Sequence, residues 1–584
     1  MSEMHDDDST QAPSQETGAT PRIERRTIVF DSPERIEVRH EDNLTANFEY
    51  FGNERLFRPR FGTSIDVIRE FDAHLRSRYE PGEYNEPSEI KAIIDHIFTF
   101  YSNLLSSNLP HVASRDVMDF VLHQYDVSCE IRRSAERGEL SASELDEWRS
   151  MSGRFRRALK YLAERIALLA PAEAPSVPRE RFLHYLDRVW KGAEELVDLY
   201  QMSELLHSVF PENAALLVCP EGDEFIFRMR INDDIHQDMG RRISESSHAK
   251  IRYPGRHPFE YDIDNYDSLL SGSFRDRVGM GFREIIQMIN ELNASVETFK
   301  ESFHIPFVNR EQVVRNLSNA LGHDESSVDL ALSGFTIAKE AMEKEGRVIW
   351  KPKQEYRAYR RAYFSFPHPT GQHLTWSKGM LIECLGFLSS ELAFQQLAPE
   401  WRSPDVDKAV AKISNEAGGW FESVVHLNID DLGLRARSYK KQIGVGSTAL
   451  KIPHEIGDLD CLATSADEQL LVLAECKMVR SGTEPAFFRG DISKFTAGDD
   501  AYFLQARRKA RWVRQNFSAV LSAVAEAHDD ESVLGIERFS VLIITYFPSI
   551  ASYFDESITC VSLAELLREY ESAGKWPYPA ESIQ

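Results

Sequence analysis

Two acidic residues and a lysine stand at the ends of two neighbouring apolar segments. The segments Leu459–Thr464 and Leu470–Ala474 flank a short polar turn, a pattern that predicts a β-hairpin of two buried strands. A hairpin centred on the turn pairs Asp460 with Glu475, with their Cβ atoms roughly 4.5–5.5 Å apart. Lys477 follows Glu475 by two residues, so it points to the same face of the sheet.

This arrangement concentrates charge at one end of an apolar stripe. Like charges that face each other across two strands are destabilising, and burying them costs more unless something compensates. A divalent cation bridging Asp460 and Glu475 would compensate, and Lys477 beside it would be placed for a nucleophile or a phosphate. The residue types and their spacing therefore indicate metal-dependent hydrolysis of phosphodiester bonds.

At these residues the chain resembles the PD-(D/E)xK nuclease superfamily, the fold of many restriction endonucleases. The family pattern is an acidic residue closing one strand, a spacer, and then (D/E)-x-K on the next strand. Here Leu459-Asp460 stands in place of the family's Pro-Asp, and Glu475-Cys476-Lys477 supplies the second half. Asp458 competes for the first acid, but Asp460 fits the paired register and begins the apolar run. The resemblance covers about residues 405–550.

The segments around the motif predict an order of elements that agrees with this resemblance. We expect a helix, a strand, the two motif strands, a long helix and an apolar strand, which is the αβββαβ core topology of the family. The fold class is therefore predicted to be multidomain, with a predominantly α-helical N-terminal region followed by an α/β restriction-endonuclease-like core. An ordinary solvated hairpin end with a chance ion pair is the alternative. The flanking elements are predicted at Val410–Asn428, Leu434–Ile443, Ala501–Ala527 and Phe539–Phe547.

The resemblance also implies a third carboxylate on the first helix of the core. Gly418-Gly419-Trp420-Phe421-Glu422 resembles the Gly-x-x-Phe-Glu segment of many family members and nominates Glu422. Glu416 is the alternative, and either side chain could be a solvated helix acid. The implied cofactor is Mg²⁺, for which Mn²⁺ can substitute, held by Asp460, Glu475 and Glu422. Lys477 would position or deprotonate the attacking water, or stabilise charge on the phosphate.

The predicted helix after the motif is strongly basic. Gln505 and Lys509 are four residues apart and share a face; some family members have Gln-x-x-x-Tyr here, and Lys509 replaces the tyrosine. The arginines of this helix suit contact with a phosphate backbone, although a solvated charged face explains them equally well. The nucleic-acid-binding candidates are Arg507, Arg508, Arg511 and Arg514.

A second segment, Tyr356–Tyr363, alternates aromatic residues with arginines. Such a pattern is found on surfaces that bind nucleic acid. Arginines that extend over a packed aromatic stripe are the more common explanation.

The whole chain has 584 residues, 42% of them hydrophobic, and a formal net charge of −25. This length predicts two to four domains, and the charge argues against passive binding of nucleic acid over the whole surface. No apolar run approaches a membrane span and the N-terminus is polar, so we expect a cytoplasmic protein without a membrane partner. The six cysteines include no C-x-x-C pair, which gives no indication of a zinc site or a disulfide framework.

The chain divides into four predicted parts. Residues 1–25 are expected to form a disordered acidic tail, 26–175 a helical domain, 176–400 an α-rich mixed domain and 405–584 the nuclease-like domain. Outside the nuclease-like part, helices are predicted at Ile65–Tyr79, Ser88–Leu105, Ser114–Glu136, Ser141–Leu169, Phe282–Leu292, Glu311–Leu321, Ser326–Glu345 and Ser377–Leu397, and a hairpin at Ala214–Cys219 and Glu224–Ile231.

Together these features predict a metal-dependent DNA endonuclease of the restriction or prokaryotic antiviral defence type. Residues 26–400 would sense a signal or regulate the nuclease, through a protein partner or a second copy of the chain. The alternative is a catalytically silent module, built on a nuclease-like fold, that binds nucleic acid or serves as a protein-interaction scaffold.

Overall fold

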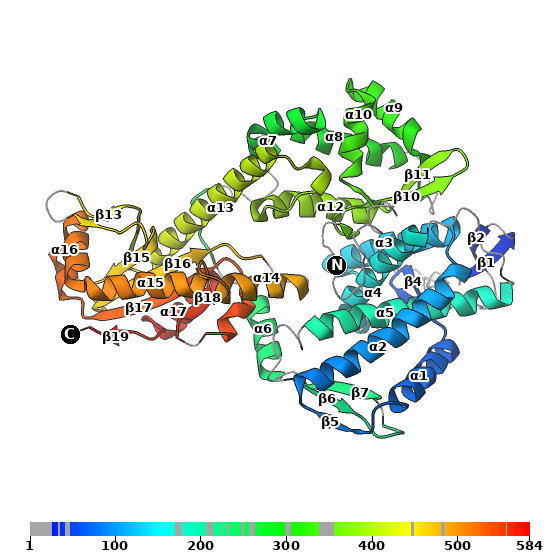
Figure 1. The fold of residues 1–584 in the computed structure, drawn as a ribbon, viewed down its shortest axis with the longest axis horizontal. Coiled ribbons are helices and arrows are strands. Elements are labelled where there is room, and N and C mark those ends of the chain that lie inside the picture. The colour runs from blue at the N-terminus through cyan, green and yellow to red at the C-terminus, as the bar shows by residue number, and fades with distance from the viewer. Residues whose placement is uncertain are drawn as a thin grey trace, which may run out of the picture.

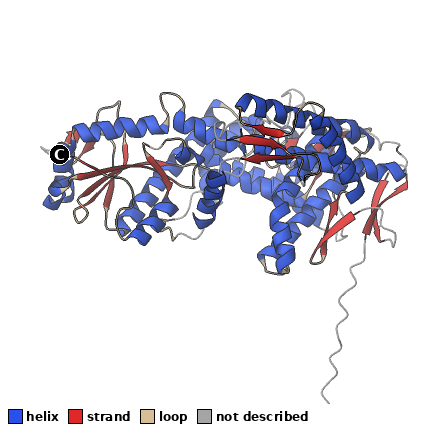
Figure 2. Cartoon of the chain, turned by 90° about the horizontal axis from the view of Figure 1, so that it is seen from below, coloured by secondary structure: helices blue, strands red, loops and turns tan. Residues whose placement is uncertain are grey.

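The computed structural model shows a mixed α/β protein in which helices predominate. Figures 1 and 2 show two lobes, and Figure 1 shows a long helix that runs from one lobe to the other. The first 25 residues, predicted to be a disordered tail, lie outside the described residues. The structure describes residues 26–32, 35–40, 47–169, 177, 179–204, 206, 214–223, 225–230, 233–246, 250–255, 263–297, 305–337, 356–445, 449–480, 485–555 and 557–583.

The first part of the N-terminal lobe (described residues up to 417) consists of long amphipathic helices. Helix α3 begins where the sequence predicts, because the Ser114 side chain accepts a hydrogen bond from the backbone N–H of Val117 at 3.3 Å and so caps the helix. The helices are α1 (Phe61–Arg76), α2 (Pro87–Asn108), α3 (Arg115–Glu136), α4 (Ala142–Leu169) and α5 (Arg179–Glu204). The strands are β1 (Arg26–Ser32), β2 (Arg35–His40), β3 (Asn47–Phe51), β4 (Glu54–Arg58), β5 (Gly82–Tyr84), β6 (Ala215–Val218) and β7 (Phe227–Arg230).

The second part of this lobe mixes helices with a four-stranded sheet of order β8-β11-β10-β9. The prediction of a helix over 326–345 is wrong about where the helix ends. It ends at Ser333, and Thr336 and Ile337 form a short strand that pairs with Tyr363 and Phe364. Gly334 after the helix leaves room for the Trp401 ring, because a Cβ there would lie 2.1 Å from that ring. The elements are α7 (Ile263–Val278), α8 (Phe282–Glu297), β8 (Phe307–Asn309), α9 (Arg310–Leu321), α10 (Glu325–Ser333), β9 (Thr336–Ile337), β10 (Tyr363–His368), β11 (Gly371–Trp376) and α12 (Lys378–Glu391). Helix α6 (Asp233–Ser246) precedes them in the chain and packs on the C-terminal lobe.

The two lobes share helix α13 (Pro404–Asp431), which runs between them in Figure 1. Val406 and Val410 near its start belong to the hydrophobic core of the N-terminal lobe. Val424 and Ile429 near its end belong to the core under the C-terminal sheet. The helix continues through Gly418 and Gly419 without a break, so one continuous helix of 28 residues connects the two cores.

The C-terminal lobe (residues 418–583) contains a six-stranded sheet with the strand order β12-β15-β16-β17-β18, and β19 pairs with β17. Leu462 pairs with Leu473 and Thr464 with Leu471, so the predicted hairpin register is confirmed. Helices cover both faces: α13 and α17 (Leu563–Ala573) pack on one, and α15 (Tyr502–Gln515) and α16 (Phe517–His528) on the other. The strands are β12 (Arg435–Tyr439), β15 (Leu459–Ser465), β16 (Leu470–Lys477), β17 (Arg538–Thr545), β18 (Thr559–Ser562) and β19 (Glu581–Ser582).

Three local details of this lobe differ from the sequence prediction. The single helix expected over 501–527 is two helices, because the backbone of Asn516 leaves the helical conformation and ends α15. The strand expected over 434–443 is divided into β12 and β13 (Gln442–Ile443), and β13 pairs with β14 (Leu450–Lys451). Helix α14 (Pro485–Thr496) was not predicted.

Helix α6 connects the N-terminal part of the chain to the C-terminal lobe. Arg242 of α6 forms a buried ion pair with Glu565 of α17, and the Tyr553 hydroxyl donates a hydrogen bond of 2.6 Å to Asp238. Farther along, the backbone N–H of Arg252 donates to Asn428 of α13 at 2.9 Å. These contacts fasten a segment of the region 176–400 to the C-terminal lobe. Among the described helices, none combines the length and apolar content needed to cross a membrane.

Candidate functional site

Asp460 and Glu475 lie side by side on the central strands of the C-terminal sheet. Cys461 pairs with Ala474, which places Asp460 and Glu475 at the next position of the ladder. Both carboxylates are buried: Asp460 is 9% exposed and Glu475 is 0% exposed. They therefore do not form a solvated hairpin end, and their charges need compensation within the protein.

Two lysines provide that compensation. The Lys477 ammonium lies 2.9 Å from Oε2 of Glu475 and 3.6 Å from Oδ2 of Asp460. The Lys509 ammonium, from α15, lies 3.5 Å from Oδ1 of Asp460 and forms a close ion pair with Oε1 of Glu475. Each carboxylate is thus held by both lysines, and the four charges balance in the absence of a metal ion.

This charge cluster changes the proton affinity of its members in different directions. Burial raises the pKa of Glu475, and the neighbouring charge of Asp460 raises it further, against the two lysines. Burial also opposes ionisation of Asp460, but Lys477 and Lys509 outweigh it and hold the pKa of Asp460 below its ordinary value. For Lys477 burial would lower the pKa, yet Glu475 and Asp460 raise it well above its ordinary value. Lys477 is consequently an ammonium ion at neutral pH.

Several neighbours hold these side chains in place. The backbone N–H of Cys476 donates a hydrogen bond of 3.0 Å to Oδ2 of Asp460. Nε2 of His426, on α13, lies 2.8 Å from the Asp460 carbonyl oxygen and therefore carries a proton. The Lys477 ammonium lies 5.0 Å from the centre of the Tyr502 ring, within the range of a cation–π contact. The site is thus fixed by the strands, by α13 and by α15.

The competing acids are placed differently from one another. Glu422 is partly buried on α13, and its pKa is raised by burial and by the charge of Asp460, so it lies near the pair. Glu416 is exposed and its carboxylate lies 3.8 Å from the Lys412 ammonium. Asp458 is also exposed. The structure therefore brings Glu422 toward the site and leaves Glu416 and Asp458 at the surface.

The carboxylate pair is suited to a hard cation that takes only one or two of its ligands from the protein. Both oxygens of Glu475 are buried and accept no hydrogen bond of good geometry, so only the ion pairs compensate them. Within the part of the chain that the structure describes, no group of three or more His, Cys, Asp or Glu side chains lies close enough to hold a metal ion. Mg²⁺ is often held by one or two carboxylates, with waters and substrate phosphates completing its shell. Two carboxylates are enough for that type of site.

The four arginines of helix α15 differ in their contacts: two of them form ion pairs within the protein. Arg507 pairs with Asp555, and its guanidinium donates to the Ser557 hydroxyl at 3.0 Å. Arg514 pairs with Glu581. Arg508 and Arg511 are exposed. These two arginines are the members of the predicted set that the structure leaves best placed for an external phosphate.

The role of Lys509 was missed at the sequence level, although the helix carried a signal for it. Ala506, Ala510 and Val513 have the spacing of one buried helix face and are indeed buried. Lys509 falls on that face and is only 5% exposed. A lysine at a core position of a helix requires a buried partner, and here the partners are the two motif carboxylates.

The aromatic and basic segment 356–363 is mainly a packing element. Tyr363 is fully buried and Arg361 is 1% exposed, with its guanidinium bound to the Glu400 carboxylate at 2.7 Å. Arg357 lies 2.9 Å from Glu164 of α4. These contacts favour the packing explanation over a continuous nucleic-acid surface.

No family model, curated protein or solved structure matches the chain. A functional assignment must therefore come from the geometry and chemistry of the site.

Proposed function

We propose that the C-terminal lobe is a metal-dependent nuclease that hydrolyses phosphodiester bonds in DNA, with a core of the PD-(D/E)xK type. The observation that carries the proposal is the buried pair Asp460 and Glu475 on adjacent strands, with Lys477 two residues further on the same face. Structural elements in the order α13, β12, β15, β16, α15 and β17 support it. On this view β13, β14, α14 and α16 are inserted between the elements of an αβββαβ core, and β18, α17 and β19 follow it.

Asp460 and Glu475 would hold the metal ion, with Glu422 the nearby candidate for a third, more distant contact. A bound Mg²⁺ or Mn²⁺ supplies Lewis acidity, which lowers the pKa of a water and neutralises charge on the phosphate. Asp460 is ready for this role because its pKa lies below the ordinary value. Burial and the neighbouring charge of Asp460 raise the pKa of Glu475, so metal binding by Glu475 would be favoured as the pH rises.

Lys477 would stabilise negative charge on the scissile phosphate. Its raised pKa keeps the side chain protonated, so it acts as a cation and hydrogen-bond donor and does not accept a proton. The Tyr502 ring limits where the ammonium can move. An ammonium fixed in a water-poor site is an effective stabiliser of charge that develops in the transition state.

Lys509 would act as the internal counter-ion of the metal-free protein. Its ammonium contacts both carboxylates, and a divalent cation on the same oxygens would compete with it electrostatically. This competition sets the metal affinity lower than two unpaired carboxylates would give. It also keeps the lobe folded without metal, because each buried carboxylate retains a partner.

Arg508 and Arg511 on the outer face of α15 would contact the DNA backbone. They belong to the same helix that supplies Lys509, which lies on the opposite, buried face of that helix beside the carboxylates. The chain as a whole carries a net charge of −25, so local contacts of this kind must overcome general repulsion. A role in restriction or antiviral defence, with the N-terminal lobe as the sensing or regulatory part, remains part of the proposal.

The test is cleavage of supercoiled, linear and single-stranded DNA, and of RNA, by the purified chain with Mg²⁺, Mn²⁺ or EDTA. We expect breakage of DNA that requires a divalent cation and stops in EDTA. Equal breakage in EDTA, or none with either metal, would count against the proposal.

A second candidate is a catalytically silent nuclease-like module that binds nucleic acid or a protein. The neutralisation of both carboxylates by two ammonium groups favours it, because such a cluster is stable without metal. Calorimetric titration with Mn²⁺ separates the two candidates. The nuclease requires metal binding that is lost in Asp460→Asn, whereas the silent module binds DNA or protein without it.

A further inference from the structure

The N-terminal lobe contains a cavity of about 490 Å³ that the nuclease proposal does not use. Its walls come from α3, α4, α5 and α12 and from residues 357 and 359. Cavities that bind small molecules typically have volumes of about 300–1,000 Å³ and occur between helices of bundles. The cavity thus has the size and location of a ligand site.

The lining of this cavity is strongly basic. It contains five cationic side chains and two carboxylates, an excess of three positive charges, in a chain whose net charge is −25. A recess lined by charges of one sign focuses the electrostatic potential and concentrates ions of the opposite sign. The cationic residues are Arg132, Arg156, Arg157, Lys160 and Arg357, and the carboxylates are Glu164 and Glu383.

Glu383 of α12 is the shared counter-ion of three of these cations. Its Oε2 lies 2.7 Å from the Lys160 ammonium, its Oε1 lies 3.7 Å from the Arg132 guanidinium, and Arg156 forms a close ion pair with it. Arg132 has a second carboxylate partner, because its Nε lies 3.5 Å from Oε1 of Glu136 on the same helix. In addition, Nε of Arg156 is buried without a hydrogen-bond partner, which leaves a charged donor unsatisfied at the cavity wall.

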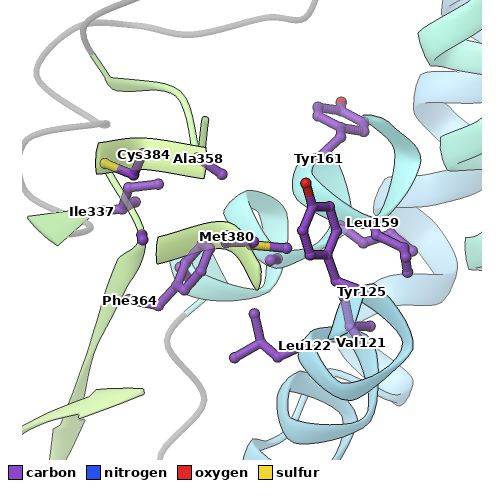
Figure 3. Close-up of a cluster of buried hydrophobic side chains, with 14 of the residues drawn as sticks. Val121, Leu122, Tyr125, Leu159, Tyr161, Ile337, Ala358, Phe364, Met380 and Cys384 are labelled. Atoms are coloured by element: carbon purple, nitrogen blue, oxygen red, sulfur yellow. The ribbon is translucent and has the colours of Figure 1, made fainter. Parts of the chain in front are cut away.

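Aromatic rings lie beside these cations. The Arg156 guanidinium lies 5.0 Å and the Lys160 ammonium 5.3 Å from the centre of the Tyr125 ring. Tyr359 and Phe387, on another part of the wall, have ring centres 4.9 Å apart. Figure 3 shows Tyr125 between Leu159 of α4 and Met380 of α12, and all three side chains belong to the hydrophobic core of this lobe.

We propose that this cavity binds a nucleotide, that is, a small phosphorylated molecule with a planar ring. The arginines and Lys160 would contact the phosphates through charge-assisted hydrogen bonds, and Phe387, a partly exposed ring of the wall, would contact the base. The walls are formed by four helices packed into one core, which suits a small molecule better than a continuous nucleic-acid strand. The proposal is independent of the nuclease activity of the C-terminal lobe.

The experiment is isothermal titration of the full chain with ATP, AMP, pyrophosphate and adenosine, in low salt with EDTA so that the carboxylate site does not contribute through a metal. We expect ATP and AMP to bind more tightly than pyrophosphate, and adenosine to bind weakest. Arg132→Gln combined with Arg157→Gln should weaken ATP binding by about tenfold or more, the value for one lost charge-assisted contact. Glu383→Gln should instead tighten it, because the internal counter-ion is removed while its shape is kept.

Arg154→Gln is the matched control: Arg154 lies on α4 and pairs with Asp198 at 2.9 Å, outside the cavity lining. Its affinity for ATP should equal that of the wild type. Absence of ATP and AMP binding, or equal affinity in all variants, would overturn the proposal. If pyrophosphate bound as tightly as ATP, the ligand would not be a nucleotide. If a DNA oligonucleotide bound and no mononucleotide did, the proposal of a small-molecule ligand would be overturned. If Glu383→Gln melts below the wild type, the double arginine variant decides the outcome.

Discussion

Replacement of Lys509 by methionine tests the internal counter-ion most sharply. The side chain is 7% exposed, and its ammonium contacts both Asp460 and Glu475. Methionine keeps the length of the side chain but removes the charge, so two buried carboxylates remain with Lys477 alone. Loss of one partner from a buried ion pair costs about 3–5 kcal/mol. For a lobe of this size each kcal/mol lowers the melting temperature by about 2–4 °C, so the expected decrease is about 6–20 °C in EDTA.

The same variant should respond more strongly to a divalent cation. Without the Lys509 ammonium a metal ion competes only with Lys477 for the carboxylate oxygens, and ligand at about 100 times its Kd stabilises the folded state by about 2.7 kcal/mol. Differential scanning calorimetry with EDTA and with Mn²⁺ measures both effects. Arg508→Met on the exposed face of the same helix is the matched control and should melt like the wild type. An unchanged melting temperature in EDTA, or an equal gain from Mn²⁺ in the variant and the wild type, would refute the reasoning.

Three further predictions concern catalysis, DNA contact and pH. Lys477→Met should reduce the cleavage rate by about a hundredfold or more without weakening Mn²⁺ binding. Single-turnover kinetics measures the first effect and calorimetry the second. Weakened Mn²⁺ binding would mean that Lys477 holds the metal-binding carboxylates in place and does not act on the phosphate. Arg508→Gln with Arg511→Gln should reduce the slope of log affinity against log salt by about 0.9 per lost phosphate contact, whereas an unchanged slope would place the DNA elsewhere. The raised pKa of Glu475 means that protonation stabilises the metal-free fold at low pH, and that this contribution is lost as the pH rises through the folded-state pKa. The affinity for the metal should change in the opposite direction and fall as the pH is lowered. Melting curves and Mn²⁺ titrations from about pH 5 to about pH 8 measure the stability and the affinity. An Mn²⁺ affinity that does not depend on pH would contradict this prediction.

The register of the motif hairpin was predictable from sequence because two simple patterns agree. The polar turn fixes the centre of the hairpin, and the apolar runs on either side of it mark the two strands, which are buried except at Lys477. Leu462 opposite Leu473 confirms that register. The starts of helices with capping residues, such as Ser114 before α3, were predictable for a similar reason: the cap acts through bonds within a few residues.

The rest of the site depends on packing between distant segments. The sequence pattern places Lys509 on the buried face of its helix, but it does not say which charges that face meets. The long helix predicted over 501–527 is interrupted at Asn516, whose local conformation has no strong sequence signal. The attachment of α6 through Arg242 and Glu565 joins positions 323 residues apart, which no local pattern reveals.

The central claim is that Asp460 and Glu475 together hold a metal ion that cleaves DNA. The most direct measurement is Mn²⁺-dependent cleavage of supercoiled DNA by Asp460→Asn, Glu475→Gln and the exposed control Asp458→Asn, with calorimetric Mn²⁺ titration of each folded variant. Our account predicts that the first two variants lose both cleavage and metal binding, and that Asp458→Asn keeps both. Cleavage at the wild-type rate by Asp460→Asn or Glu475→Gln would contradict it.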